Sequence, residues 1–491
     1  MTHDDFPVRP RLVVTGTGSA WGYVLVAADI VIALGVSVHV ALNKRDERAA
    51  VAWLTLVWFS PFVGAALYWL FGINRIARRA AKLRGPRRFG ELGRPLGDDA
   101  SINLSADNPF LVYQANLIRR FRLTPFAAGN RVRPLRSGDL AYPAMLEAIG
   151  AAKASVALAT YIFNDDPLGR RFVDALAAAR ARGVEVRVLI DGIGALYSFP
   201  PIIWRLRRRD IRTERFLASL WPWRMPYLNL RNHRKLLVVD GRIGFIGGMN
   251  LKRSHVLADR PRWPTDDLQF QIDGPAVADL LAVFVEDWAF ASGEILAGES
   301  WFPTLEAAGT SVLRCIASGP NEEFGSLRLA LLGALAQVRH SLRIATPYFL
   351  PDEEITSLLA VAALRGVAVD IVLPERSNQF YMKWAEAAAF PRLLGAGCRI
   401  WLEAPPFDHA KIALADGQWI LFGSSNWDAR SLRLNFELDC ECVDPALAQE
   451  IGALVDAKIA RARPITLEGL RARGFLRRLR DGVARLLKPF L

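Results

Sequence analysis

The sequence has few cysteines and lacks common metal-binding motifs, which argues against a disulfide-rich protein and against a zinc protein. Only four cysteines occur in 491 residues and none forms a Cys-x-x-Cys pair, so a disulfide framework is not expected. Free, packed thiols of this kind are typical of a reducing compartment. The six histidines form no His-Glu-x-x-His pattern. Without that pattern or a cysteine cluster, the sequence does not predict a zinc site.

Acidic residues are too few to balance the basic ones. The net charge is +13, hydrophobic residues make up 52% of the chain and charged residues 23%. That is too charged for a protein made only of membrane helices and too apolar for an ordinary soluble protein. The balance fits a short membrane part followed by two or three folded domains. A basic surface attracts nucleic acid, anionic lipid or phosphorylated substrates, and composition does not choose among these.

Two long apolar runs lie near the N-terminus, at residues 21–42 and 49–71. Each is long enough to cross a hydrocarbon core of about 30 Å as a helix. A soluble core helix and a cleavable signal peptide are the alternatives, and the short turn at residues 43–48 argues against both. Pro61 is expected to kink the second run. Asp29, inside the first, is either a functional residue or an acid with a partner across the hairpin.

Basic residues gather on the outer flanks of this hairpin. Nine lie outside its two ends and three lie in its turn. The positive-inside rule therefore predicts that both termini and the folded domains are cytoplasmic. Residues 75–88 contain seven of these basic residues and no acid, so they are expected to lie against anionic headgroups.

From about residue 130 the chain follows one α/β pattern twice. The sequence GVEVRVLID at Gly183 is matched by GVAVDIVLP at Gly366. Alternating strands and helices predict an α/β fold with mixed, largely parallel sheets flanked by helices, and the duplication predicts two lobes related by a pseudo-two-fold axis. The expected elements are helices 145–152 and 168–182 with strands 155–163 and 184–190, then helices 331–341 and 353–364 with strands 342–349 and 367–373.

These features predict six segments. They are an N-terminal cytoplasmic segment (1–20), a transmembrane hairpin (21–73), a basic membrane-proximal linker (74–125), a first lobe (126–305), a second lobe (306–463) and a basic amphipathic tail (464–491).

Each copy then contains the motif H-x-K-x(4)-D-x(6)-G-[GS]-x-N. Side chains two apart in a strand share a face, so the histidine and lysine of each motif project together. If the lobes meet, two imidazoles, two ammoniums and two amides line one pocket. The motif residues are His233, Lys235, Asp240 and Asn250 in the first copy, and His409, Lys411, Asp416 and Asn426 in the second.

Such a pocket suits a phosphodiester. Lysines and asparagines hold its oxygens and stabilise charge in the transition state. One neutral imidazole can attack phosphorus while the other, protonated, gives its proton to the leaving alcohol. The ordinary histidine pKa near 6.5 lets both forms exist at neutral pH. Because the lysines supply positive charge, no metal or other cofactor is expected. The alternative is that both histidines are buried residues with only a structural role, and repetition of the whole motif argues against this alternative.

The duplicated motif resembles that of the phospholipase D superfamily over nearly the whole chain. Further stretches are similar to bacterial cardiolipin synthases, among them YIFNDDPLGRRFVDAL at Tyr161, GGMN at Gly247 and TPYFLPD at Thr346. The resemblance implies an enzyme of the bacterial inner membrane. It would transfer a phosphatidyl group from one phosphatidylglycerol to another through a covalent phosphohistidine and release glycerol.

The resemblance also implies roles for individual residues. His233 resembles the nucleophile and His409 the acid/base partner; the two motifs by themselves leave these roles interchangeable. Asp267 and Glu437 match acids that orient the histidine of the opposite lobe.

Other motif positions carry weaker expectations. Asn250 and Asn426 should hold phosphate together with the two lysines. Asp240 and Asp416 belong to the catalytic motif, yet a structural role in fixing loop and strand is also open. The first motif has Gly248 where the second has a serine, so one hydroxyl contact is missing or supplied elsewhere.

Alternatives remain at the level of activity. Hydrolysis, or transfer from other phospholipids, would use the same residues. The membrane hairpin argues against a nuclease, and the intact motifs argue against an inactive scaffold. The expected partners are therefore membranes and the anionic phospholipids phosphatidylglycerol and cardiolipin, without nucleic acid; no signal for an oligomeric state is present. The aromatic segment 221–227 and the basic amphipathic tail from Leu467 could each contact lipid or pack on the lobes.

Overall fold

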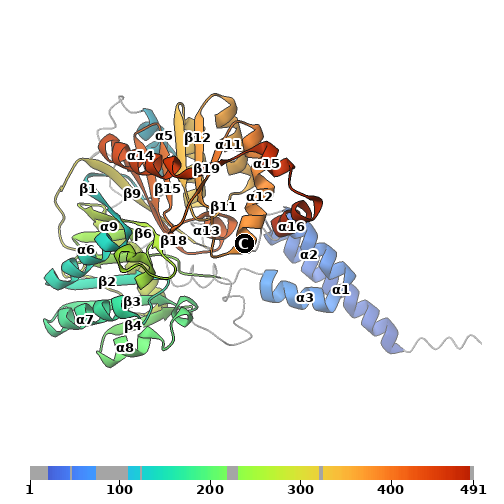
Figure 1. Ribbon diagram of the computed structural model, residues 1–491. Coiled ribbons are helices and arrows are strands. Elements are labelled where there is room, and N and C mark those ends of the chain that lie inside the picture. Colours follow the sequence, from blue (N-terminus) through green and yellow to red (C-terminus); the bar gives the residue numbers. More distant parts are fainter. Residues whose placement is uncertain are drawn as a thin grey trace, which may run out of the picture. The chain divides into compact units, whose positions relative to one another are not determined.

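The protein divides into two compact units, residues 1–75 and 76–491, in a computed structural model (Figure 1). The basic stretch 75–88 and the aromatic segment 221–227 lie outside the described residues. The structure describes residues 20–44, 47–72, 109–121, 124–217, 230–319 and 325–486.

In the first unit, helix α1 (Ala20–Asn43) is 24 residues long, or about 36 Å. Within the described residues, it is the one helix both long and apolar enough to cross a membrane, with a mean hydropathy of 2.3 over its most apolar 18 residues. Its C-terminal half contacts the second apolar run through two polar bonds. His39 Nδ1 lies 2.8 Å from Tyr68 Oη, and Trp58 donates to Ser37 Oγ at 3.1 Å.

The second apolar run is not one straight helix. It forms α2 (Glu47–Phe59), α3 (Pro61–Leu67) and the π-helical turn η1 (Tyr68–Gly72). The chain turns sharply at Ser60, because Pro61 has no N–H to continue the helical bonds. The turn brings Gly64 so close to α2 that a Cβ there would lie 2.7 Å from Val57 Cα. The expected kink is therefore a complete break.

Within the part of the chain that the structure describes, the second unit is built on one mixed sheet of 15 strands that both predicted lobes share. Antiparallel pairing of β1 with β9 joins the two halves. The first half contains β1 (Ala127–Arg136), β2 (Ser155–Thr160), β3 (Glu185–Asp191), β4 (Arg212–Phe216), β5 (Leu236–Val239), β6 (Ile243–Gly247) and β8 (Leu268–Asp273). The second contains β9 (Ser311–Ser318), β10 (Ser341–Ala345), β12 (Ala368–Pro374), β13 (Arg399–Glu403), β15 (Ile412–Ala415), β16 (Trp419–Gly423), β18 (Glu437–Val443) and β19 (Ala462–Ile465).

From this join outward the two halves repeat the same strand order. The first runs β1-β8-β6-β5-β2-β3-β4 and the second β9-β18-β16-β15-β10-β12-β13, with β19 added at the edge. In each copy the strands of the first two strand–helix units pair in parallel: β2 pairs with β3 in the first copy and β10 with β12 in the second. The sequence repeat is therefore a repeat of structure, and the α/β duplication is confirmed.

Helices cover both faces of this sheet (Figure 1). In the first lobe Val156 and Leu158 of β2 pack under α6 and α7, while Ala157 and Ala159 face the core that contains α9. The helices of the unit are α5 (Pro109–Phe121), α6 (Ser137–Ala151), α7 (Pro167–Ala181), α8 (Ile202–Arg208), α9 (Val277–Ser292), α10 (Ser326–Gln337), α11 (Glu353–Leu364), α12 (Phe380–Gly395), α13 (Ala429–Arg433), α14 (Pro445–Ala460), α15 (Leu467–Arg471) and α16 (Phe475–Leu486).

Equivalent helices begin and end with the same local chemistry. Asp166 caps α7 by accepting from Gly169 N at 2.9 Å, and Asp352 caps α11 by accepting from Ile355 N at 3.0 Å. Each helix is followed by a glycine at φ +92°, Gly183 or Gly366, a conformation that L side chains rarely adopt.

One hydrophobic core continues across both lobes. Phe270 of β8 stacks on Phe422 of β16 with ring centroids 3.8 Å apart. The same cluster contains Trp288 of α9 and Ile451 of α14. All four cysteines are free and buried. This shared core holds the two halves as one body and fixes the junction at which the site forms.

Candidate active site

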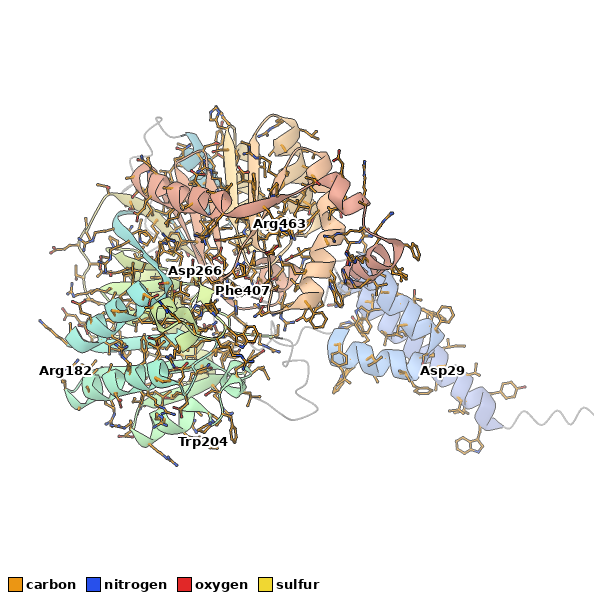
Figure 2. The ribbon with its side chains drawn as sticks, viewed as in Figure 1. Asp29, Arg182, Trp204, Asp266, Phe407 and Arg463 are labelled. Atoms are coloured by element: carbon orange, nitrogen blue, oxygen red, sulfur yellow. The ribbon has the colours of Figure 1, made fainter. Side chains whose placement is uncertain are left out.

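Two backbone crossings between the lobes carry the motif histidines. β14 (Phe407–Asp408), just before His409, pairs in parallel with β7 (Thr265–Asp266) of the first lobe, and Figure 2 labels Phe407 and Asp266 near the centre of the unit. His409 N donates to Asp266 O at 2.8 Å. In the same way His233 N donates to Phe436 O of the second lobe at 2.8 Å. Each histidine is thus fixed by backbone from the opposite lobe.

Each imidazole is also held by a carboxylate of the opposite lobe. His233 Nδ1 lies 3.0 Å from Glu437 Oε2, and His409 Nδ1 lies 2.8 Å from Asp267 Oδ2. Both acids are completely or almost completely buried. Because a carboxylate accepts, Nδ1 carries the hydrogen, and Nε2 keeps the lone pair. Such an arrangement leaves Nε2 of each ring as the reactive nitrogen.

One cavity of about 750 Å³ is lined by both histidines and both motif asparagines. This volume lies in the range of small-molecule sites. Asn250 Oδ1 accepts from Ile162 N at 3.1 Å, and Asn426 Nδ2 donates to Ser431 Oγ at 3.4 Å. The lobes therefore bring together the two imidazoles and two amides that were expected to meet.

Burial controls the charge of these rings. Burial lowers the pKa of His233; Glu437 opposes this shift, while Lys235 adds to it. The pKa of His409 is lowered further, by burial and by the charges of Lys411 and Lys235. With pKa values below the ordinary 6.5, both imidazoles are neutral at pH 7, as a nucleophile must be. A bound phosphodiester anion would favour protonation of one of them.

The two acids differ from each other. Burial raises the pKa of Asp267 to about 6. Burial acts on Glu437 in the same direction, but the charge of His233 when protonated, hydrogen bonds from His233 and Ser424, and the charge of Lys235 outweigh it and leave its pKa below the ordinary value. Glu437 is therefore the more firmly ionised of the pair at neutral pH.

Both motif lysines are buried, each with its ammonium against the backbone carbonyl of the histidine in the same motif. Lys235 Nζ donates to His233 O and Lys411 Nζ donates to His409 O. Neither lysine is among the described residues that line the cavity. Burial lowers the pKa of Lys235 to about 7 and that of Lys411 to about 8. One of three donors is used in each of these bonds, so each ammonium has further N–H groups to offer an anion.

The glycine–serine difference between the motifs has a structural reason. Gly248 and Ser424 occupy equivalent positions, as do Asp267 and Glu437. A Cβ on Gly248 would lie 2.5 Å from Asp267 Oδ1, so only glycine fits beside the shorter acid. Beside the longer acid, Ser424 Oγ donates to Glu437 Oε2 at 2.6 Å. The first lobe supplies no counterpart to this hydroxyl at position 248.

Asp240 and Asp416 require a correction, because they were grouped with the catalytic motif residues. The structure places them at the far ends of β5 and β15 from the histidines, outside the cavity lining. Each adopts a left-handed conformation, with φ of 51° and 49°. Asp240 accepts from the N–H groups of residues 153–155, and Asp416 accepts from those of residues 339–341. These bonds join strand ends and leave the aspartates remote from the chemistry.

Several cavity residues were not anticipated from the motifs. His255 is buried with its ring 6.3 Å from that of His409, and Tyr161 has its ring 5.2 Å from that of His233. Arg231 and Arg430 add positive charge to the cavity wall. Arg231, two residues before His233, lines the cavity, whereas Lys235, two residues after it, does not, so spacing along the chain did not identify the cationic residue that faces the cavity.

Within the described residues, no group of three or more histidine, cysteine, aspartate or glutamate side chains is arranged to hold a metal ion. The cavity instead combines imidazoles, amides and cationic side chains from two copies of one fold. A duplicated α/β fold that presents one His-x-Lys motif from each copy to a single cavity defines the phospholipase D class.

Comparisons with known proteins narrow this class. The family model described as "Cardiolipin synthase, PLD-like domain" matches residues 145–288 and 331–458, and the phospholipase D-nuclease N-terminal model matches residues 31–72. Cardiolipin synthase 1 of Bacillus anthracis is 30% identical over 99% of this chain and 97% of its own length. Cardiolipin synthase A of Pseudomonas aeruginosa (strain LESB58) is 32% identical over 98% of both chains. The chain belongs to the family of phospholipase D-like cardiolipin synthases.

A solved structure shares the fold at lower identity. Phosphatidylserine synthase of Haemophilus influenzae Rd KW20 superposes with a TM-score of 0.60 and 14% identity, and the match covers 77% of this chain and 100% of that one. It supports the arrangement of the two lobes independently of close sequence similarity.

Proposed function

We propose that this enzyme joins two phosphatidylglycerol molecules into cardiolipin and releases glycerol. The single observation that carries the proposal is one cavity lined by two imidazoles, each held through Nδ1 by a buried carboxylate of the opposite lobe. A phosphatidyl group bound between them would have a nitrogen nucleophile on one side and a proton donor on the other. Family membership supplies the identity of the lipid.

The reaction runs in two balanced steps. Nε2 of one imidazole attacks phosphorus, the P–O bond to the head glycerol breaks, and the second imidazolium gives its proton to the departing oxygen. The now neutral second imidazole then removes a proton from a hydroxyl of another phosphatidylglycerol. That oxygen attacks phosphorus, the P–N bond breaks, and the first imidazole is restored. By resemblance His233 attacks and His409 serves as acid and base.

The other polar groups would stabilise charge. We propose that Asn250 and Asn426 bind the non-bridging oxygens, and that the ammoniums of Lys235 and Lys411 turn toward them from behind the histidines. Since the pKa values of these lysines are near 7 and 8, binding of the anionic headgroup is expected to weaken as pH rises above about 8. A bound phosphate would oppose this loss by raising both pKa values.

Hydrolysis is the second candidate activity, because water in place of the lipid alcohol would give phosphatidic acid at the same site. The deciding experiment supplies purified protein in mixed micelles with phosphatidylglycerol and resolves the products. Cardiolipin with equimolar glycerol is the expected result. Phosphatidic acid alone would overturn the synthase proposal and leave the phosphohistidine chemistry intact.

The catalytic pair is tested by substitution. His233→Ala and His409→Ala are each expected to lower turnover by several orders of magnitude, because each removes a group that reacts directly. His340→Ala is the matched control, since that side chain is exposed on the second lobe. A near-normal rate in either cavity variant would refute the two-histidine mechanism.

We also propose a membrane topology and a symmetry. Helix α1 crosses a bacterial inner membrane, and the broken second run of α2, α3 and η1 returns across it to complete the hairpin. The pseudo-two-fold-related lobes lie on the cytoplasmic side; the excess of basic residues outside the hairpin supports this orientation. In intact cells, a membrane-impermeant thiol reagent is expected to label Lys44→Cys in the turn. Leu364→Cys, 72% exposed on the second lobe, should react only after permeabilisation. The reverse pattern would overturn the orientation.

A further inference from the structure

Helix α16 packs on the rest of its unit through a small and polar face. Asp481 and Ala484 are its buried residues, and its main neighbour is α12. The Arg480 guanidinium lies over the Trp384 ring of α12 at 4.5 Å. Asp481 accepts hydrogen bonds from Arg473 and Arg480. The inner face of this helix is therefore held by ion pairs and a cation–π contact.

The outer face of α16 is apolar and exposed. At 100° per residue its five large apolar side chains fall within an arc of about 100°, opposite the face that contains the two buried residues. A helix at the surface of a soluble domain has the reverse arrangement, with its apolar stripe turned inward. The exposed side chains are Phe475 (75%), Leu476 (77%), Leu479 (50%), Val483 (53%) and Leu486 (72%).

The charge around this apolar face is of one sign. Arg477, Arg478, Arg480 and Arg485 belong to the helix, and Asp481, its one acid, is buried and already paired. Arg478 and Arg485 lie on one margin of the apolar arc and Arg480 on the other, by the same helical geometry. An apolar stripe flanked by arginines is the pattern of a helix that lies in an anionic bilayer interface.

We propose that the exposed face of α16 inserts into the interfacial region of a bilayer containing anionic phospholipid, and so docks the catalytic unit on the membrane independently of the N-terminal helices. Charge complementarity favours this occupant over a second copy of the chain. Two α16 faces in contact would bring their arginine rows together with no exposed acid on either helix to offset them.

Docking at α16 would also set the position of the cavity. Tyr381, in the first turn of α12, lines the cavity, and its neighbour Phe380 is 62% exposed. The Phe380 ring contacts that of Trp384, with centroids 4.9 Å apart, and Trp384 in turn contacts Arg480 of α16. One helix thus connects the proposed lipid-binding face to the cavity wall. This consequence, unlike the docking itself, depends on the proposed function.

The test uses the full-length protein in vesicles, with an environment-sensitive fluorophore attached to Leu479→Cys. Phosphatidylserine mixed into phosphatidylcholine supplies negative charge without supplying substrate. We expect the label to be shielded from an aqueous quencher in these vesicles and accessible in phosphatidylcholine alone. A label on Leu364→Cys, exposed on α11, should stay accessible in both. Accessibility of residue 479 in anionic vesicles, or equal shielding in neutral lipid and detergent, would overturn the proposal.

Two pairs of substitutions separate the apolar and electrostatic contributions. Leu476→Ser with Leu479→Ser should abolish shielding of a label at Val483→Cys. Arg478→Gln with Arg485→Gln should reduce the preference for anionic vesicles by about fivefold per arginine, and added salt should reduce the wild-type preference in the same direction. Retained shielding in the serine pair, or a retained preference in the glutamine pair, would count against bilayer insertion.

An activity assay distinguishes failure of docking from failure of the proposed function. The serine pair should raise KM for phosphatidylglycerol in vesicles while leaving turnover of a monomeric short-chain phosphatidylglycerol unchanged. Equal loss on both substrates would mean that the substitutions act on the fold or the site, and would overturn the docking role. If the wild-type enzyme used neither lipid, the proposed function would be overturned. The shielding experiment alone would then test whether α16 inserts into the bilayer.

Discussion

Replacing Glu437 with glutamine would remove a charge from the His233 site while changing its shape very little. The carboxylate lies 3.0 Å from His233 Nδ1 and is fully buried, so no solvent screens the contact. A glutamine oxygen can still accept from Nδ1–H, but it does not stabilise an imidazolium. Loss of a buried, charge-assisted bond of this kind costs about 3 kcal/mol, which corresponds to roughly a hundredfold in kcat.

The pH dependence of Glu437→Gln would identify the role of His233. The carboxylate raises the pKa of this histidine against the effect of burial, so its removal must lower that pKa. If His233 attacks, the acidic limb of the kcat/KM profile, where the nucleophile becomes protonated, moves to lower pH. If His233 is the acid instead, the alkaline limb moves to lower pH. Either shift is measurable by steady-state cardiolipin formation across the pH range.

Asp267→Asn is the matched variant in the other lobe. It should affect His409 in the same way, so the limb that moves should be the opposite one. Thermal unfolding of each variant checks that the fold is retained. A rate within threefold of the wild type, together with an unshifted profile in both variants, would refute the argument that these carboxylates act through the imidazoles.

The remaining predictions concern the residues around the motifs. Gly248→Ser should lose most activity and destabilise the fold by about 1–3 kcal/mol, because its Cβ would overlap the Asp267 carboxylate. Ser424→Ala, which removes the hydroxyl's two hydrogen bonds (to Glu437 and from Leu438 N) and adds no atom, should be milder in both kinetics and denaturant unfolding. Asp240→Ala and Asp416→Ala each remove an acceptor of three backbone N–H bonds, and should lower stability by about 3 kcal/mol while the turnover of the folded fraction stays near that of the wild type. A folded, inactive Asp240→Ala enzyme would restore that residue to the catalytic group.

Local patterns in the sequence predicted much of the secondary structure. The helix predicted over 353–364 agrees with α11, and the strand predicted over 367–373 is shifted by one residue from β12. These elements are set by nearby signals such as the Asp352 cap and the glycine that follows the helix. Helix α6 begins eight residues before its predicted start and includes Pro143.

Long-range packing decided what local patterns did not. The second apolar run has the composition of one membrane helix, yet Pro61 and the approach of Gly64 to Val57 divide it into separate segments. Likewise, the sequence repeat predicted two lobes, but hydrogen bonds between β1 and β9 join their strands into one sheet. The periodicity of a sequence does not show the angle at which a helix breaks at proline. It also does not show which two edge strands pair with each other.

The sequence by itself determined the reacting histidines, because the whole motif from histidine to asparagine recurs at equivalent places of the repeat. The expectation that each lysine shares the histidine's face was wrong, since the histidines line the cavity and the lysines do not. Tertiary structure alone decided that His233 contacts Glu437, 204 residues away, and that His409 contacts Asp267, 142 residues away. The resemblance suggested these acids, but only the crossing of the lobes brings them within hydrogen-bond distance. Tertiary structure also placed Asp240, a motif residue, away from the cavity. Asp240 follows the four-residue strand β5, whose other end is the one nearer His233.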